Sequence, residues 1–583
     1  MTDPDAPWWI DAVVYQVYPR SFADSDGDGV GDLRGITARL DYLATLGIDA
    51  IWLSPVYASP HADNGYDISD YQAIDPMFGT LADLDELIAG AHHRGIRIVL
   101  DLVVNHTSDE HEWFAESRSS RSSAKRDWYW WRPPRPGFVG GTPGAEPTNW
   151  ESFFSGSTWT WDEATGEYYL HLFAAKQPDL NWENAEVRAA IHSMMRWWLD
   201  RGVDGFRMDV INLISKDPAL PDGVTAAGSA YGDGFPHYAT GPRIHEFVAE
   251  LHREVLAGRD AELLTVGEMP GVTWEQARLF TDPERAELSM VFQFEHVSLD
   301  QGRTKFEPVP LSLPALKASL AGWQDGLGDV GWNSLYWSNH DQPRAVSRFG
   351  DDGRWWRESA TALATVLHLH RGTPFVYQGE ELGMTNAPWE HVDQLRDIES
   401  INFYAKALAA GVPPETAFEG LLSRGRDNAR TPMQWDDGPH AGFTTGTPWL
   451  PVNPNHRWLN AAAQVGTERS VFEHYRALIA LRHEDPVVAE GGFRLLHADD
   501  PDLWVFERTL TGHPTLLVLA NWSGATRELP SDLAAWAGAE LVLANYAGAC
   551  DVGGPLRPWE ARVLRAGPTV QTGSASGTVG SRR

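Results

Sequence analysis

The sequence predicts an α/β protein built on a (β/α)8 TIM barrel, with an inserted subdomain after the third strand and a C-terminal β-sandwich. Eight short apolar segments alternate with amphipathic helices over most of the first 485 residues, which is the pattern of a barrel of parallel strands. Residues 105–175 interrupt this rhythm, and a new pattern of short strands and turns begins near residue 486. The hydrophobic content of 43% and charged content of 22% are typical of a folded globular protein.

The expected barrel strands are apolar runs bounded by polar or turn residues. They lie at 13–18, 48–54, 96–104, 203–209, 263–268, 288–294, 332–338 and 373–378. The helical segments between them include "LRGITARLDYLATLG" (33–47), "TLADLDELIAGAHHRG" (80–95) and "NAEVRAAIHSMMRWWLDRG" (184–202), and each ends in a glycine, the residue most often found after a helix C-terminus. A doubly wound open sheet would show fewer strands and a Gly-rich nucleotide loop, and the sequence has no such loop.

The same patterns divide the chain into four parts. The barrel takes residues 1–104 and 176–485. Residues 105–175 are rich in Trp, Pro, Gly and Ser, and are expected to form a subdomain over the carboxyl-end face of the barrel, where such barrels keep their active sites. Residues 486–568 form the expected β-sandwich, and the low-complexity tail 569–583 is expected to be disordered.

The charge and cysteine content restrict the partners and the compartment. The chain has 47 Lys and Arg against 80 Asp and Glu, a formal charge of −33, which argues against nucleic acid and anionic membrane as partners. Its one cysteine, Cys550, fits a reducing compartment, so a cytoplasmic location is expected. The sequence has neither a recognisable signal peptide at its start nor an apolar run long enough to span a bilayer.

Charged residues stand at the ends of the expected strands, where a barrel gathers its site. They are Asp101, Arg207, Asp209, Glu268, His340 and Asp341. No Cys/His cluster, G-x-S-x-G motif or phosphate-binding loop accompanies them, which leaves carboxylate chemistry on an uncharged substrate. Glycoside hydrolysis needs two opposed carboxyl groups and little else. For any one of these acids a buried ion pair is the favoured interpretation, but four that converge on one mouth favour catalysis.

Several motifs then stand in a characteristic order. "DLVVNH", "GFRMDVIN", "GEM" and "SNHDQPR" follow one another along the chain, together with "QPDLNW" and "RDNARTPMQW". The sequence resembles the α-amylase superfamily of retaining α-glycosidases, and within it the oligo-1,6-glucosidase (isomaltase) group. The resemblance extends from "VVYQVYPRSF" through "HAGFTTGTPW".

The resemblance implies a role for each acid. Asp209 would be the nucleophile, Glu268 the acid/base, and Asp341 the third acid, which grips sugar hydroxyls and the transition state. The nucleophile and acid/base of retaining enzymes lie about 5–5.5 Å apart. Arg207 would hold Asp209 ionised by lowering its pKa.

The resemblance also implies a set of substrate contacts. Asp67 would fix the terminal glucose, Tyr66 would stack on it, His106 and His340 would hydrogen-bond its hydroxyls, and Arg430 would reach the non-reducing sugar. Val210 would border the leaving sugar and favour α-1,6 bonds. Strict strand alternation turns Val210 away from the cavity, so this role assumes that the strand bends at its end.

A second motif, "DSDGDGVGD", places Asp24, Asp26, Asp28 and Asp32 at near-alternate positions with glycines between them. It resembles the start of an EF-hand loop, and related enzymes hold a structural calcium ion here with the carbonyl of the Val30 position as a further ligand. A solvated acidic turn is the alternative. No organic cofactor is expected.

The expected substrates are small neutral α-glucosides: isomaltose and isomalto-oligosaccharides, with maltose and sucrose as further candidates. Sucrose isomerases, trehalulose synthases and other transglucosylases of the same group are the main alternative, but residues 295–308 lack the clustered arginines of isomerases. A phosphosugar hydrolase would want extra basic residues at the mouth. Non-enzymatic relatives carry a membrane span and lack catalytic carboxylates, unlike this chain.

Overall fold

The computed structural model describes residues 7–259, 261–548 and 552–568. Each of the eight expected barrel segments contains a strand. The strands are β1 (Val14–Val17), β2 (Ala50–Leu53), β5 (Arg97–Val103), β9 (Gly205–Asp209), β12 (Leu264–Glu268), β13 (Met290–Phe292), β14 (Ser334–Leu335) and β15 (Thr373–Tyr377). The predicted tail, 569–583, and Cys550 lie outside the described residues.

The eight strands form one sheet in the order β13-β12-β9-β5-β2-β1-β15-β14. Neighbouring strands are parallel, and β15 pairs with β1, so the chain returns to its starting strand. A parallel bridge between Val291 and Asn333 joins the remaining edges, β13 and β14. The sheet is therefore a nearly closed parallel barrel, and the predicted fold class is confirmed.

Two of the three helical segments named above each form one helix, α3 (Leu81–His93) within 80–95 and α5 (Ala185–Asp200) within 184–202. Thr80 caps α3 in a capping box with Asp83, and Asn184 caps α5. One expected helix is divided, because the backbone leaves the helical region at Arg39 between α1 and α2. The helices that follow the barrel strands are α1 (Leu33–Ala38), α2 (Leu40–Leu46), α3 (Leu81–His93), α5 (Ala185–Asp200), α7 (Ile244–Leu251), α8 (Trp274–Thr281), α9 (Leu313–Leu327), α10 (Ala345–Phe349), α11 (Trp356–His368) and α16 (Val471–Glu484).

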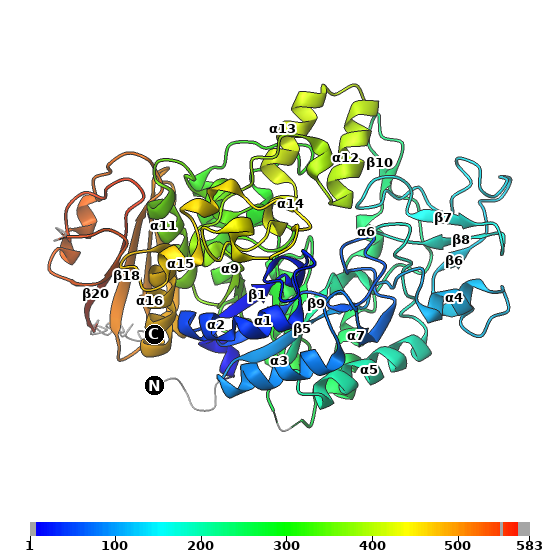
Figure 1. Cartoon of the computed structure of the whole chain (residues 1–583), viewed down its shortest axis with the longest axis horizontal. Helices are drawn as coiled ribbons and strands as arrows, with labels where there is room; N and C mark the ends of the chain where they lie inside the picture. The colour runs from blue at the N-terminus through cyan, green and yellow to red at the C-terminus, as the bar shows by residue number, and fades with distance from the viewer. Residues whose placement is uncertain (1–6, 260, 549–551, 569–583) are drawn as a thin grey trace, which may run out of the picture.

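Two excursions stand above the carboxyl ends of the strands. The first, between β5 and α5, contains α4 (Glu112–Arg118) and a three-stranded sheet of β6 (Trp131–Arg132), β7 (Trp159–Asp162) and β8 (Glu167–Leu170). The second follows β15 and contains α12 (Ile398–Ala409), α13 (Pro414–Arg424) and α14 (Asp427–Arg430). Figure 1 shows the first excursion at one end of the molecule and the α12–α13 pair on top of the barrel.

Two short strand pairs and one short helix lie in the loops after β2 and β9. The antiparallel pair β3 (Tyr57–Ala58) and β4 (Asp70–Ile74) follows β2, while β10 (Val224–Thr225) pairs with β11 (Gly232–Asp233) after β9. The short helix α6 (Phe235–Tyr238) leads from β11 toward α7.

The C-terminal region is an antiparallel sheet of five strands in the order β16-β17-β18-β20-β19. The strands are β16 (Gly492–Leu496), β17 (Leu503–Thr509), β18 (Pro514–Asn521), β19 (Glu540–Ala544) and β20 (Ala561–Pro568). One face, with Phe506 and Val518, joins the core of the barrel, and the other face carries a separate small core. The described residues thus form one sheet against the barrel, where a sandwich would supply a second sheet.

A buried ammonium ties this sheet to the barrel. Lys317 of α9 is 1% exposed and donates to the backbone carbonyls of His497, Asp500 and Leu503 at 2.8–2.9 Å. Burial lowers the pKa of Lys317, and three carbonyl dipoles take the place of the water that a free ammonium would bind. In the described part of the chain, no helix is long and apolar enough to cross a membrane.

Candidate active site

Arg207 is the centre of a buried charge cluster at the carboxyl ends of three neighbouring strands. Its Nη1 lies 2.7 Å from Asp101 Oδ1 and 2.8 Å from Asp209 Oδ1, and its Nη2 lies 2.6 Å from Glu268 Oε2. The guanidinium also lies over the Trp52 ring, 4.9 Å from its centroid. One fixed planar cation therefore positions three carboxyl groups from β5, β9 and β12.

The cluster contains three carboxyl groups and one guanidinium, so full ionisation would leave excess negative charge. Burial makes that ionised state more costly in free energy. Burial raises the pKa of Asp101 to about 6, with Glu268 adding to the rise and Arg207 opposing it. Burial raises the pKa of Asp209 well above its usual range, again against the pull of Arg207. Arg207 does lower the pKa of Asp209, as expected, but burial raises it by more. The cluster retains a proton more readily than three separate carboxylates would.

Asp341 stands apart from this cluster, in a setting of opposite charge. Its Oδ1 lies 2.7 Å from Arg430 Nη2 and 3.3 Å from Arg426 Nη1. Burial opposes ionisation of Asp341, but the positive charges of Arg426 and Arg430 hold its pKa well below the usual range. Asp341 keeps 30% of its side chain exposed, so the ionised carboxylate faces the cavity.

His340 is neutral, because burial lowers its pKa to about 3. Its Nδ1 lies 2.8 Å from Gln16 Nε2, which can only donate, so the ring proton belongs on Nε2, 3.6 Å from Asp341 Oδ1. The ring stacks on Tyr66 at 5.1 Å between centroids. Both aromatic rings are thereby fixed beside the third acid.

Tyr66, Asp209, Glu268 and Asp341 line one cavity of 350 Å³, which is the size range of small-molecule sites. Arg207 and His340, two of the predicted substrate contacts, do not line it. The strand ends supply Asp209, Val210, Glu268 and Asp341 to its floor. The walls come from the excursions above the barrel and include Phe153, Phe154, Phe173, Glu399 and Arg426. Asn402 of α12 donates to the carbonyl of Phe154 at 3.0 Å, which joins the two excursions across the mouth.

Val210 turns into this cavity because the backbone reverses directly after Asp209. Its φ of 36° and ψ of 42° place it in the left-handed region, which a β-branched residue rarely adopts. The bend that the sequence argument assumed is therefore present, and Val210 lines the pocket. The same turn directs the backbone N–H of Val210 toward Glu268 Oε2, 3.2 Å away. Strain of this kind costs on the order of 1–3 kcal/mol and is concentrated at functional sites.

Asp67 does not reach the cavity, and the expectation for it needs correction. Its carboxylate is fully buried in its own loop, where it accepts hydrogen bonds from the backbone N–H groups of Ala62 and Asp63. The carboxylate that lines the cavity is that of Asp63, which lies 3.2 Å from Arg426 Nη2. Asp67 shapes the loop, and Asp63 is the group offered to a ligand.

Arg430 needs a similar correction. It is buried behind Asp341, donates to the carbonyl of His340 and does not line the cavity. The cavity arginine is Arg426, whose guanidinium lies within 3.4 Å of Asp63, Asp341, Asp397 and Glu399. Arg426 stands in the same "RDNAR" motif, four residues earlier.

The other two predicted contacts lie at the cavity wall. Tyr66 lines it and donates its hydroxyl to Asp101 Oδ2 at 3.0 Å. His106 also lines it, yet both ring nitrogens already contact protein groups, Nε2 at 3.1 Å from the Tyr66 carbonyl and Nδ1 at 3.2 Å from Asn105 Nδ2. The hydrogen bond from His106 to a sugar stays a prediction.

Sequence reasoning missed a further ion pair at the mouth. Lys305 Nζ lies 2.7 Å from Glu399 Oε2, and both residues line the cavity. They are 94 residues apart, and neither stands in a strand-end motif. Nothing in the local sequence marks them, because their proximity depends on how α12 lies over the barrel.

The acidic loop after β1 brings three of its four aspartates together. One carboxylate oxygen from each of Asp24, Asp26 and Asp28 lies within 4.8 Å of the others. Asp32 is engaged elsewhere, as the N-cap of α1, where it accepts from the backbone N–H of Gly35. The oxygen donors of the three aspartates fit a hard cation such as calcium.

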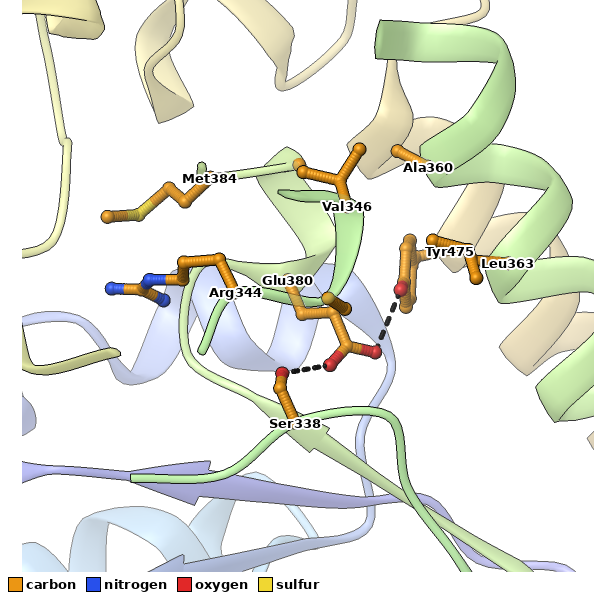
Figure 2. Close-up of a pocket in the computed structure, with 10 residues that line it drawn as sticks. Ser338, Arg344, Val346, Ala360, Leu363, Glu380, Met384 and Tyr475 are labelled. Atoms are coloured by element: carbon orange, nitrogen blue, oxygen red, sulfur yellow. Dashed lines mark hydrogen bonds between the residues drawn. The ribbon is translucent and has the colours of Figure 1, made fainter. Parts of the chain in front are cut away.

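A second, much smaller cavity lies behind the Asp341 loop and is distinct from the active site. Figure 2 shows Glu380 between Ser338 and Tyr475, whose hydroxyls donate to its carboxyl oxygens at 2.7 and 3.0 Å. Burial raises the pKa of Glu380 to about 7. The group links the ends of β14 and β15 to α16, so it serves the fold.

A parallel barrel with opposed carboxyl groups at its carboxyl-end mouth defines a glycoside hydrolase site. The comparisons specify the family. Residues 16–491 match the model of the alpha-amylase catalytic domain, and the chain belongs to the alpha-amylase family.

Relatives match nearly the whole chain. An oligo-1,6-glucosidase of Halalkalibacterium halodurans is 55% identical over 95% of this chain and 98% of its own length. A trehalose-6-phosphate hydrolase of Bacillus subtilis is 46% identical over 97% and 99%. Among solved structures, the trehalose-6-phosphate hydrolase of Bacillus licheniformis has a TM-score of 0.89 at 44% identity, and the trehalulose synthase of Pseudomonas mesoacidophila 0.90 at 42%, each covering 96% of this chain and 100% of the other.

Proposed function

We propose that this protein is a retaining oligo-1,6-glucosidase, which removes non-reducing terminal α-1,6-linked glucose from short oligosaccharides. The main support is the charge cluster in which Arg207 pairs with Asp209 and Glu268, both of which line one cavity. Asp341 lines the same cavity and pairs with a different arginine, Arg430. The high identity to proteins named oligo-1,6-glucosidase supports the linkage.

The three acids divide the reaction among them. Asp209 attacks the anomeric carbon and forms a glucosyl-enzyme ester, while Glu268 gives its proton to the departing oxygen. Glu268 then takes a proton from water, which attacks the same carbon and releases glucose with its original configuration. Asp341, kept ionised, stabilises the positive charge of the oxocarbenium-like transition state.

The charges around the cavity favour a neutral sugar over a phosphosugar. Its carboxyl groups are Asp63, Asp209, Glu268, Asp341 and Glu399. The two long cations that line it, Lys305 and Arg426, both pair with carboxylates. A phosphate would have to displace those partners, so hydrolysis of a phosphorylated disaccharide is the less favoured activity.

Hydrolysis is also favoured over isomerisation. Isomerases retain the leaving sugar, and the corresponding stretch here, residues 295–308, offers Ser298, Gln301 and Lys305 to the cavity. The arginine of this stretch, Arg303, is largely exposed and pairs with Glu307.

We propose that the Asp24–Asp26–Asp28 group holds a structural calcium ion. The loop packs on a distant segment, since Asp24 accepts from the Thr444 hydroxyl and the N–H of Trp449 donates to the carbonyl of Gly29. A cation there would neutralise three carboxylates and stabilise this contact, with no part in the chemistry. Calcium as the metal and the carbonyl of Val30 as a ligand are predictions.

The cytoplasmic location expected from the single cysteine also stays a prediction, which fractionation of the source cells would test.

Product analysis tests the proposed activity. The purified protein is incubated with isomaltose, panose, maltose and sucrose, and we expect glucose from the α-1,6 bonds of isomaltose and panose. Asp209→Asn, Glu268→Gln and Asp341→Asn are each expected to lose several orders of magnitude in kcat while keeping the wild-type melting temperature within a few degrees. Trehalulose or isomaltulose as the main product from sucrose would favour the isomerase instead, and near-wild-type turnover in a variant would remove that residue from its role.

A further inference from the structure

A second hollow adjoins the active-site cavity. This hollow has a volume of 430 Å³ and shares Gly271, Phe294 and Ser298 with the active-site cavity. It runs over the loop before α8 and the turn after β13. The two hollows therefore share part of their walls, and together they are called the groove.

The groove lies on the side of the active-site cavity where the leaving sugar is expected. Gly271 follows Glu268 by three residues, so the groove leaves the cavity on the side of the acid/base. The acid/base protonates the oxygen of the leaving sugar, so a leaving group longer than one sugar would extend along that side.

The far part of the groove carries an aromatic ring with one face free. Trp274, the first residue of α8, is 39% exposed and lines the hollow. Its indole rests on α9 at Gly326, where a Cβ would stand 2.5 Å from Trp274 Cδ2. Only glycine leaves room for the ring, although glycine within a helix costs about 1 kcal/mol relative to alanine.

The position of the indole is further fixed by its helix. Thr273 and Gln276 form a capping box at the start of α8, which sets the backbone of Trp274. Across the hollow, Glu295 is oriented by the indole N–H of Trp323, which donates to its Oε2 at 2.9 Å. The groove thus combines a rigid apolar ring with a carboxylate and the hydroxyls of Thr273 and Ser298.

We propose that this groove is a binding site for the third and later glucose units of isomalto-oligosaccharides, with Trp274 as the stacking platform. The flat C–H face of a pyranose packs on an exposed aromatic ring, and its hydroxyls find acceptors and donors along the rim. The proposal rests on the proposed α-1,6-glucosidase activity and adds a preference for substrates longer than isomaltose.

The test compares kcat/KM for isomaltose, isomaltotriose and isomaltotetraose. Wild type is expected to be more efficient with the longer substrates. Trp274→Ala should lower the ratio of isomaltotriose to isomaltose efficiency about tenfold, mainly through KM, because one aromatic contact is worth roughly that factor. Trp274→Phe should restore part of the ratio. Leu279→Ala, an exposed position of the same helix that does not line the groove, is the matched control and should keep the wild-type ratio.

The outcomes separate the two claims. Suppose that Trp274→Ala melts like wild type, cleaves isomaltose and keeps the wild-type ratio of isomaltotriose to isomaltose efficiency. That result overturns the groove as a binding site but leaves the glucosidase activity standing. An equal loss in Leu279→Ala also overturns the groove, because it points to a general effect of altering α8. Absence of α-1,6 cleavage in the wild type overturns the proposed function and the groove with it.

Discussion

At the scale of single residues, two aspartates of the loop 61–67 have different surroundings. Asp63 faces the cavity, and Asp67 binds the backbone N–H groups of its own loop. We expect Asp63→Ala to raise KM for isomaltose at least tenfold with little change in melting temperature, because a cavity carboxylate is lost. Asp67→Ala should instead lower the melting temperature by several degrees, because two buried N–H groups lose their acceptor.

Steady-state kinetics and thermal melts of the two variants check this division. The reverse pattern, with a stable Asp67→Ala that has lost substrate affinity, would return the binding role to Asp67.

The sequence could not separate these two residues. Both stand in "ADNGYDIS", and either spacing from Tyr66 suits a binding role. The backbone decides, because His61, Asn64 and Gly65 all adopt positive φ and fold the loop back on Asp67. In the same way, the sequence does not show which arginine of "RDNAR", Arg426 or Arg430, lines the cavity. By contrast, Asp209, Glu268 and Asp341 end or follow barrel strands, so strand position alone placed them at the cavity.

Val210 combines backbone strain with a position beside the leaving sugar. Its rigid branched side chain lines the cavity, and steric discrimination of about one methyl group is worth about 1–3 kcal/mol, or roughly 10–200-fold. The wild type should therefore prefer isomaltose to maltose by about that factor, and Val210→Ala should raise maltose turnover more than isomaltose turnover. A variant with an unaltered ratio would show that another residue selects the linkage.

At the scale of elements, the loop after β1 is predicted to depend on metal. Asp24, Asp26 and Asp28 lie together, and a bound cation would reduce their mutual repulsion further than the backbone N–H groups of Gly27 and Gly29 that donate to Asp24. Because such a cation binds the folded state alone, chelation should lower the melting temperature by several degrees. Specific activity of the still-folded enzyme should stay nearly constant, since the loop does not line the active-site cavity.

Elemental analysis and melts before and after exhaustive chelation provide the measurement, with Asp26→Asn as a variant that should show a smaller shift. An unchanged melting curve together with no bound metal would leave the loop as an acidic turn.

The elements that could be predicted are those whose sequence fixes them locally. The eight barrel strands and the capped helices α3 and α5 follow from apolar runs, caps and terminal glycines. The break at Arg39 does not, because Arg39 lies over the ring of Trp435, nearly 400 residues away in the chain. The position of α12 above the mouth likewise depends on contacts such as Asn402 with Phe154.

At the scale of the whole molecule, buried neutral histidines make stability depend on pH. Burial lowers the pKa of His368, His296 and His474 to about 3 and that of His370 to about 4. The unfolded chain binds these protons near pH 6.5, so their contribution to stability is complete above that pH and falls as the pH drops toward the folded pKa.

His368 gives the sharpest test, because neither ring nitrogen has a partner among the described residues. Relative to wild type, His368→Leu should gain about 2 kcal/mol of unfolding free energy between pH 7 and pH 5. His483→Leu is the control of opposite sign, since hydrogen bonding to Asp49 raises the pKa of His483 and its contribution is present at acid pH. Denaturant unfolding at the two pH values measures both. Parallel pH dependence in His368→Leu and wild type would contradict the assignment.

The proposed reaction is a double displacement at Asp209 on an α-1,6-glucoside, and the anomeric form of the newly released glucose distinguishes it from a single displacement. Proton NMR follows the wild-type enzyme with isomaltose on a timescale shorter than mutarotation. Half of the glucose comes from the reducing end of isomaltose and is released in the anomeric proportions of the substrate, so the newly formed anomer is the excess over that background. We expect this excess to be α-glucose, which then converts to the β-anomer, because two inversions at the same carbon restore its configuration. An initial excess of β-glucose over the same background would mean a single displacement by water and would contradict the role given to Asp209.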